Sequence, residues 1–316
     1  MQKLAILICA AATSFGAASA QTPDQPLASF PYTPGLDVSA MDTSADPCVD
    51  FYQYTCGGWM KNNPIPADQP RWSVYGKLSQ DNQRYLWGIL QDLASRTKGR
   101  NATQQKIGDY FAACMNENAI EKLGAGPLQP YLARIDAMKS TRDLPRVLAQ
   151  LHLATANGGL LFGFGANQDF ADSSSVIAFA TGGGLGLPDR DYYTKDDEKS
   201  KDIRAKYVAH VARTLELLGD APVVAQSRAA KVMEIETALA RASLTRVDKR
   251  NPYKLFHKVD LKSLRAMAPD FDWDAYLKSV GVGGLDSFNV TEPAFYAELE
   301  NQLRSDDLGD IKIYLR

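Results

Sequence analysis

Residues 46–72 read DPCVDFYQYTCGGWMKNNPIPADQPRW and carry the strongest local structure signals in the chain. Asp46 is a typical helix N-cap, and Pro47 suits the first position of a helix. Gly57-Gly58 is typical of a helix end. The stretch therefore predicts a short helix between these signals.

Two cysteines lie within this predicted helix. Cys48 and Cys56 are eight residues apart, which at a rise of about 1.5 Å per residue separates their Cα atoms by about 12 Å. A disulfide needs Cα atoms within about 7 Å. If the helix is correct, these two cysteines do not bond to each other.

The same stretch carries a family resemblance. The pattern DPCxDFYxYxCGGWxxxNxIPxxxxRW closely resembles the opening of the neprilysin and endothelin-converting-enzyme family of zinc metallopeptidases. The resemblance runs from about Met41 to the last residue. The other segments that carry it are Gln105-Lys106, Tyr110-Phe111, Cys114–Glu117, Gly186–Tyr193 and Lys231–Glu236.

The resemblance implies a zinc site that this chain does not contain. In the family, H-E-x-x-H on a helix and a downstream Glu hold the metal, and the Glu of the motif activates water. The chain has three histidines, separated by 58 and 47 residues and never followed by Glu: His152, His210 and His257. We expect no catalytic and no metal-binding residue here, and we expect the chain to stop before the C-terminal catalytic half that family members carry.

The cysteine count agrees with this expectation. Removal of a signal peptide at residues 1–20 would leave Cys48, Cys56 and Cys114, an odd number for an oxidising compartment. The resemblance implies that their disulfide partners lie far downstream, beyond the chain end. In the isolated chain we expect free thiols.

Arg71 is the candidate substrate-binding residue. The resemblance implies that it grips the C-terminal carboxylate of a peptide, a group that matches the two parallel donors of a guanidinium. Without the resemblance, Arg71 would be interpreted as a surface arginine. Neprilysin has a second arginine eight residues further on, where this chain has Ser79, so a strong preference for dipeptide-like C-termini is not expected.

The N-terminus predicts export. Residues 1–20 combine Lys3, an apolar run and Ala18-Ser19-Ala20, which is typical of a cleaved signal peptide. Residues 21–41, rich in Pro and Ser, are expected to form a flexible leader. No later segment is apolar enough to span a membrane after signal cleavage. The net charge of −2 suggests neither nucleic acid nor an anionic membrane as a partner.

The remaining pattern predicts a mainly α fold: a multi-helical lobe with one small β-hairpin, truncated before the catalytic zinc lobe. Proline in residues 62–70 predicts an extended strap. The hairpin is expected at residues 160–166 and 175–180. Helices are expected from residue 74, from about 101, and near residues 127–138, 144–156, 196–218, 221–243, 261–267, 273–279 and 292–304.

Other motifs for chemistry are missing. The Gly182–Gly186 loop has neither the Lys-Ser/Thr of a P-loop nor the G-x-G-x-x-G of a dinucleotide site, and no G-x-S-x-G elbow exists. Asp196-Asp197-Glu198 is interpreted as a helix start and not as a metal site.

We therefore divide the chain into a segment at residues 42–72, which in the family packs on the catalytic lobe, and a helical peptidase N-terminal domain at residues 73–316. The predicted function is the N-terminal domain of an exported, periplasmic or extracellular zinc metalloendopeptidase. Its partners would be peptide substrates and a C-terminal catalytic half, with zinc bound only by the full-length protein. The alternative is a non-catalytic, secreted helical module that binds peptides or regulates an intact paralogue.

Overall fold

The structure is a computed structural model, and it forms two compact units, residues 1–122 and residues 123–316. The predicted signal peptide lies outside the described residues. The residues that the structure describes are 25–32, 34–67, 69, 71–155 and 159–316.

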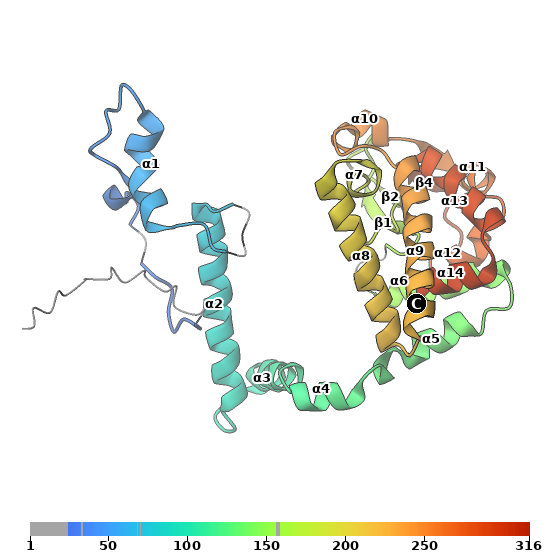
Figure 1. Cartoon of the computed structure of the whole chain (residues 1–316), viewed down its shortest axis with the longest axis horizontal. Coiled ribbons are helices and arrows are strands. Elements are labelled where there is room, and N and C mark those ends of the chain that lie inside the picture. The colour runs from blue at the N-terminus through green and yellow to red at the C-terminus, as the bar shows by residue number, and fades with distance from the viewer. Residues whose placement is uncertain (1–24, 33, 68, 70, 156–158) are drawn as a thin grey trace, which may run out of the picture. The chain divides into compact units, whose positions relative to one another are not determined.

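The first unit is helical (Figure 1) and has little core of its own. Leu93 is the only apolar side chain in its described part that is almost fully buried, whereas Phe51 and Tyr75 are 67% and 84% exposed. Its elements are η1 (Val38–Ala40), α1 (Phe51–Asn62), α2 (Val74–Ser95), α3 (Ala102–Cys114) and α4 (Glu117–Leu123).

The start predicted for the first helix is wrong. The side chain of Asp50 caps α1 by accepting a hydrogen bond from the N–H of Gln53, and the helix begins at Phe51. Asp46 instead closes a turn, because its carbonyl accepts from the N–H groups of Val49 and Asp50 at 3.0 and 2.9 Å. Of the two aspartates near the start of α1, Asp50 and not Asp46 is the N-cap.

The stop predicted at Gly57-Gly58 is also wrong, because both glycines lie inside α1. A Cβ on Gly58 would lie 2.4 Å from the carbonyl oxygen of Ser39 and 2.6 Å from that of Met41. The glycine therefore lets the chain around η1 press against the helix, at the expense of helix propensity. Gly57-Gly58, which the sequence pattern assigned to a helix end, is a site of close packing inside the helix.

The two longer helices begin where the sequence predicts. Ser73 caps α2, and Asn101 and Gln104 form the predicted capping box at the start of α3. The described part of the predicted leader contacts α2: the N–H of Leu27 donates to the carbonyl of Arg84 at 3.0 Å.

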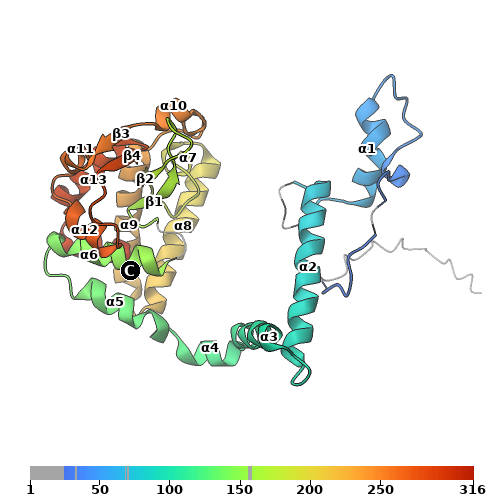
Figure 2. The same cartoon turned by 180° about the vertical axis from the view of Figure 1, so that it is seen from behind.

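The second unit holds most of the buried core. Its shorter elements are η2 (Gly126–Leu128), α5 (Gln129–Asp136), η3 (Thr141–Asp143), α6 (Leu144–Ala154), α7 (Asp191–Thr194), η4 (Asp248–Arg250), α10 (Pro252–Leu255), α11 (Leu261–Met267), α12 (Trp273–Ser279), α13 (Pro293–Ser305) and α14 (Leu308–Leu315). The long helices α8 (Glu198–Leu217) and α9 (Pro222–Ala242) run side by side in front of the sheet in Figure 1 and behind it in Figure 2.

The predicted hairpin is confirmed and belongs to a larger sheet. The strands β1 (Phe162–Gln168) and β2 (Val176–Gly182) pair antiparallel. The sequence analysis missed β3 (Lys258–Asp260) and β4 (Ser287–Val290), which extend the sheet in the order β1-β2-β4-β3. The β2–β4 pair is parallel, and the β3–β4 pair is antiparallel.

An aromatic cluster holds the sheet against the helices. The ring of Phe162 lies 5.3 to 6.0 Å from the rings of four neighbours and 5.4 Å from the imidazole of His152. His152 bridges two elements, because its ring nitrogens lie 2.7 Å from the hydroxyl of Tyr276 and 2.8 Å from the carbonyl of Leu160. The four aromatic neighbours are Phe271, Trp273, Tyr276 and Tyr296.

The carbonyl of Leu160 can only accept, so Nε2 of His152 carries a proton, and Nδ1 accepts from the hydroxyl of Tyr276 when the ring is neutral. Burial lowers the pKa of His152 below its ordinary value of 6.5, against the opposing effect of the hydrogen bond to Leu160. Because the unfolded chain then binds more protons, this contribution to stability is complete above about pH 6.5 and is lost as the pH falls.

We predict that acidification from about pH 7.5 to about pH 5.5 lowers the free energy of unfolding less in His152→Gln than in the unmodified protein. Urea titrations at both pH values measure the two differences. His210→Gln is the control, because His210 is exposed on α8 and should leave the pH dependence unchanged. Equal pH dependence in the unmodified protein and in His152→Gln would contradict the prediction.

Candidate functional site

The strap that carries Arg71 lies between α1 and α2. Asn63 ends α1, with its backbone N–H donating to the carbonyl of Trp59, and the described residues between it and Val74 form no helix or strand. Arg71 is exposed, and its guanidinium makes no hydrogen bond or ion pair with the part of the chain that the structure describes. The side chain is therefore free to bind an anion.

An apolar groove of about 580 Å³ lies beside the strap. Cys56 lines it, half-buried, with the hydroxyl of Thr55 3.5 Å from its sulfur. The aromatic and aliphatic residues that line it are Tyr52, Trp59, Met60, Ile65, Trp72 and Val74.

The three described cysteines are free thiols. Cys48 lies in the turn before α1 and not on the helix, so the helical rise does not fix its separation from Cys56. Cys114 is the last residue of α3, and both Cys48 and Cys114 are exposed. The disulfides that the resemblance implies involve cysteines outside this chain, so they stay a prediction.

The described histidines form no metal site. His210 is exposed on α8, and His257 places Nδ1 3.1 Å from the carbonyl of Val290. Both ring nitrogens of His152 are already hydrogen-bonded. Among the described residues, no group of three or more His, Cys, Asp or Glu side chains could hold a metal ion.

Two segments that carry the family resemblance, residues 186–193 and 231–236, meet at a buried carboxylate. Glu236 on α9 is only 4% exposed. Its Oε2 accepts a hydrogen bond from the hydroxyl of Tyr193 on α7 at 2.6 Å, and its Oε1 accepts from that of Tyr207 on α8 at 2.8 Å. The N–H of Leu187 donates to the Tyr193 hydroxyl at 2.8 Å.

Burial dominates the electrostatics of this cluster. It raises the pKa of Glu236, although the hydrogen bonds from Tyr193 and Tyr207 oppose that shift. Burial and the neighbouring Glu236 carboxylate also raise the pKa values of both tyrosine hydroxyls. The hydroxyls therefore keep their protons and remain donors to Glu236.

The glycine at the start of the motif permits this packing. A Cβ on Gly186 would lie 2.0 Å from the hydroxyl oxygen of Tyr207. The sequence analysis missed Glu236 as part of a cluster. One signal could have found it, because Glu236 lies on the same helix face as four apolar residues that are also buried: Val232, Ile235, Leu239 and Ala240.

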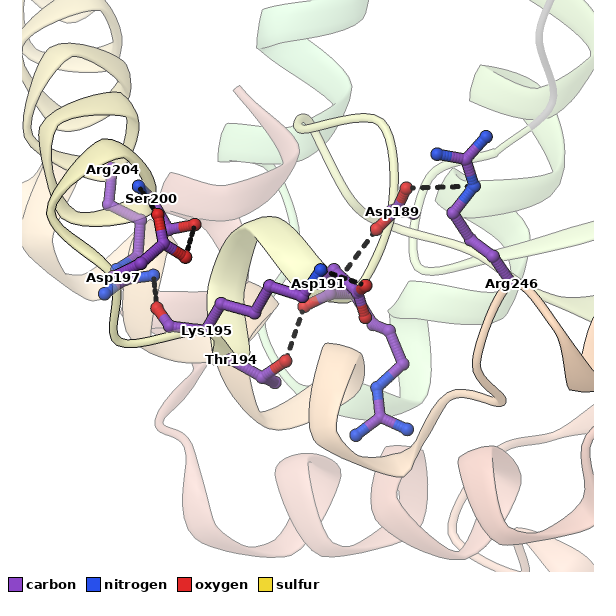
Figure 3. Close-up of polar contacts among 9 residues, drawn as sticks. Asp189, Asp191, Thr194, Lys195, Asp197, Ser200, Arg204 and Arg246 are labelled. Atoms are coloured by element: carbon purple, nitrogen blue, oxygen red, sulfur yellow. Dashed lines mark hydrogen bonds and ion pairs between the residues drawn. The ribbon is translucent and has the colours of Figure 1, made fainter.

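Figure 3 shows how charged residues fix the rest of the motif. Oδ1 of Asp189 accepts a hydrogen bond from the N–H of Asp191 at 2.8 Å, and Oδ2 of Asp189 lies 3.5 Å from Nε of Arg246. Arg204 on α8 donates to the carbonyls of Tyr192 and Lys195 at 2.9 and 2.7 Å, which caps the end of α7.

The acidic run that follows α7 is a helix start, as predicted. Asp197 caps α8 through hydrogen bonds from the N–H and hydroxyl of Ser200, which lower the pKa of its carboxyl. This capping interaction is also drawn in Figure 3. These contacts give the Asp189–Ser200 segment a structural role.

We predict that Tyr193→Phe and Tyr207→Phe each lower the free energy of unfolding by about 1–3 kcal/mol, because each removes one hydrogen bond to the buried carboxylate of Glu236. Urea denaturation measures the change. Tyr192→Phe is the matched control, since no hydrogen bond joins the Tyr192 hydroxyl to another described residue, and it should change stability by less than about 0.5 kcal/mol. If Tyr193→Phe and Tyr207→Phe lower the free energy of unfolding no more than Tyr192→Phe does, the structural role assigned to Glu236 is wrong.

Comparisons with known proteins place the chain in a family. Residues 47–316 match the family model for peptidase family M13. The chain is 31% identical over 248 residues to human endothelin-converting enzyme 1 and 30% identical over 245 residues to neprilysin-3 of Drosophila melanogaster. These alignments cover 77% and 75% of this chain but 32% and 31% of the relatives, so the chain spans about a third of their length.

Solved structures agree. The crystal structure of the Mycobacterium tuberculosis zinc metalloprotease Zmp1 with an inhibitor superposes with a TM-score of 0.78 at 26% identity, covering 89% of this chain and 42% of that one. The structure of PepO from Lactobacillus rhamnosis, at 17% identity and a TM-score of 0.66, shares the fold. The chain belongs to peptidase family M13, as an N-terminal region of a zinc metallopeptidase.

Proposed function

We propose that this chain is the helical, substrate-enclosing lobe of an exported zinc metalloendopeptidase that acts on oligopeptides. The match of residues 47–316 to the M13 family model carries the proposal. Since the chain spans about a third of its relatives, the activity belongs to a larger enzyme of which this lobe is one part.

The residues described here do not fit a zinc site. No described group of His, Cys, Asp and Glu could hold the ion, and the sequence contains no H-E-x-x-H. A catalytic zinc needs three protein ligands and one open position. We therefore propose that zinc binding and hydrolysis belong to a C-terminal catalytic half and that the isolated chain does not hydrolyse peptides.

Residues 42–72 are proposed to pack on that catalytic half. The groove beside the strap is apolar, and the first unit exposes large side chains while burying almost none. Apolar surface of this extent normally marks an interaction site. The exposed thiols of Cys48 and Cys114 and the half-buried thiol of Cys56 would form their family disulfides with downstream cysteines.

Arg71 is the residue proposed to contact substrate. It is exposed at the end of the strap and pairs with no described residue, which leaves its two parallel donors available for a C-terminal carboxylate. Ser79 lies exposed on α2 and supplies no second guanidinium. The proposed specificity is therefore for a free carboxylate.

The cellular location is proposed to be periplasmic or extracellular, because residues 1–20 have the pattern of a signal peptide. Among the described residues, none of the helices has the length and apolar character that a membrane crossing requires. With a net charge of −2, neither nucleic acid nor an anionic membrane is proposed as a partner.

We predict that Arg71→Ala weakens binding of the peptide acetyl-AFAL, with a free C-terminal carboxylate, by about 10-fold to 100-fold. This factor corresponds to the loss of hydrogen bonds to a charged group. The amide of the same peptide should bind the unmodified protein as weakly as acetyl-AFAL binds Arg71→Ala. Isothermal titration measures both, and Arg142→Ala, which removes an exposed arginine of the other unit, is the control.

The same peptide separates the two functional hypotheses. The isolated chain with added zinc should bind the peptide without cleaving it, as expected for a lobe that lacks the metal site. Cleavage that a chelator stops would overturn the assignment of hydrolysis to another part of the enzyme. Peptide binding that does not depend on Arg71 would favour the alternative of a secreted peptide-binding or regulatory module.

A further inference from the structure

Among the described residues, no strand pairs with the outer edge of β1. The N–H of Asp169 donates to the carbonyl of Ser175 at 2.9 Å, directly after the last β1–β2 pair. Antiparallel bonding alternates along a ladder, so the backbone groups of Phe164 and Ala166 face away from β2. No hydrogen bond from the described residues reaches these two N–H groups or these two carbonyls.

This edge lacks the features that normally protect a sheet edge. The strand reads FGFGANQ and contains no charged residue and no proline. Gly163 is explained by the fold, because a Cβ there would lie 2.3 Å from Oγ1 of Thr181. The fold does not explain Gly165 in this way, because a Cβ at that position would meet no atom within 4 Å. A glycine in such a position leaves room for another backbone to approach.

An apolar groove of about 580 Å³ lies next to this edge. Its size is within the range of sites that hold small ligands or a few side chains. The hydrogen-bonded His152–Tyr276 pair lines it without offering a charge. Its main apolar residues are Phe164, Ala166, Val176, Val280, Val282 and Leu285.

One charged residue lines the groove. Asp286 is exposed, and its carboxylate makes no hydrogen bond or ion pair within the described part of the chain. Among the side chains that line the groove, it is the only acid, and no Lys or Arg accompanies it. A basic group in an occupant would complement this charge.

We propose that the β1 edge and this groove bind a short extended peptide, which adds a strand to the sheet beside β1. The backbone of the peptide bonds the N–H and carbonyl groups of Phe164 and Ala166, which gives affinity without sequence specificity. Alternate apolar side chains of the peptide enter the groove, and a Lys or Arg pairs with Asp286. This site is separate from Arg71 and from zinc hydrolysis, so it does not rest on the proposed function.

The test uses fluorescence anisotropy of labelled VTVTVTK amide, whose lysine lies on the same face as its valines and which has no free carboxylate, with the unmodified 316-residue chain and without zinc. Ala166→Pro removes an outward N–H and leaves the β1–β2 hydrogen bonds in place, because the N–H of residue 166 does not face β2. The expected effect is at least about a tenfold loss of affinity. Near-ultraviolet circular dichroism checks that the variant is folded.

A second arm needs no protein variant. The same peptide with N-methyl groups on the amides that face β1 should bind about tenfold more weakly, whereas N-methylation of the alternate amides should have little effect. Equal binding of both N-methylated peptides would overturn the proposal, and so would failure of the unmodified peptide to bind.

A third arm tests the charge. Asp286→Asn should weaken binding of VTVTVTK amide about threefold to tenfold and reduce its salt dependence, but it should not change binding of VTVTVTL amide. Asp196→Asn, an exposed acid on another part of the unit, is the matched control. Self-association of the chain that Ala166→Pro abolishes, in the absence of peptide binding, would show that a second copy covers the edge and would contradict the proposal.

Discussion

The second unit depends on one constraint, which is that a carboxylate taken out of water must find hydrogen-bond donors. Glu236 is buried on α9, and its two oxygens take donors from α7 and α8. An unpaired buried carboxylate would cost far more than a typical surface contact contributes. The cluster therefore fixes the position of α7 relative to the two long helices, and with it the turn that begins at Gly186.

Backbone groups near this cluster also find hydrogen-bond partners, and these partners are tyrosine hydroxyls. The hydroxyl of Tyr193 serves two partners, because it donates to Glu236 and accepts from the N–H of Leu187. The hydroxyl of Tyr314 on α14 works in the same way, accepting from the N–H of Leu161 and donating to the carbonyl of Gly184. Two tyrosines thus satisfy the backbone of the glycine-rich segment that connects β2 to α7, which has no ladder of its own.

The sequence predicted those features of the fold that are local. The starts of α2, α3 and α8 were predictable because one side chain and an N–H three residues later determine each cap. The strands β3 and β4 were not predictable, because a short strand is identified mainly by the distant strand with which it pairs. Gly58 was misinterpreted for the same reason, since the carbonyls that require it lie 17 and 19 residues earlier, at Met41 and Ser39.

The candidate sites were predictable to different degrees. Arg71 came from resemblance alone, because an exposed arginine without partners has no local signature. The Glu236 cluster had a sequence signal in the helix periodicity, but its tyrosines come from two other helices. The open edge of β1 could not be predicted, because a strand is an edge only once the whole sheet order is known.

The two units differ in what stabilises them. The second unit has a continuous aromatic and aliphatic core, so burial of apolar surface can stabilise it independently. The described part of the first unit buries one apolar side chain almost completely and relies on caps, on Gly58 and on hydrogen bonds between the leader and α2. Such a unit gains most of its stability from whatever covers its apolar surface. That is the physical reason for the proposal that residues 42–72 form an interface with a C-terminal catalytic half.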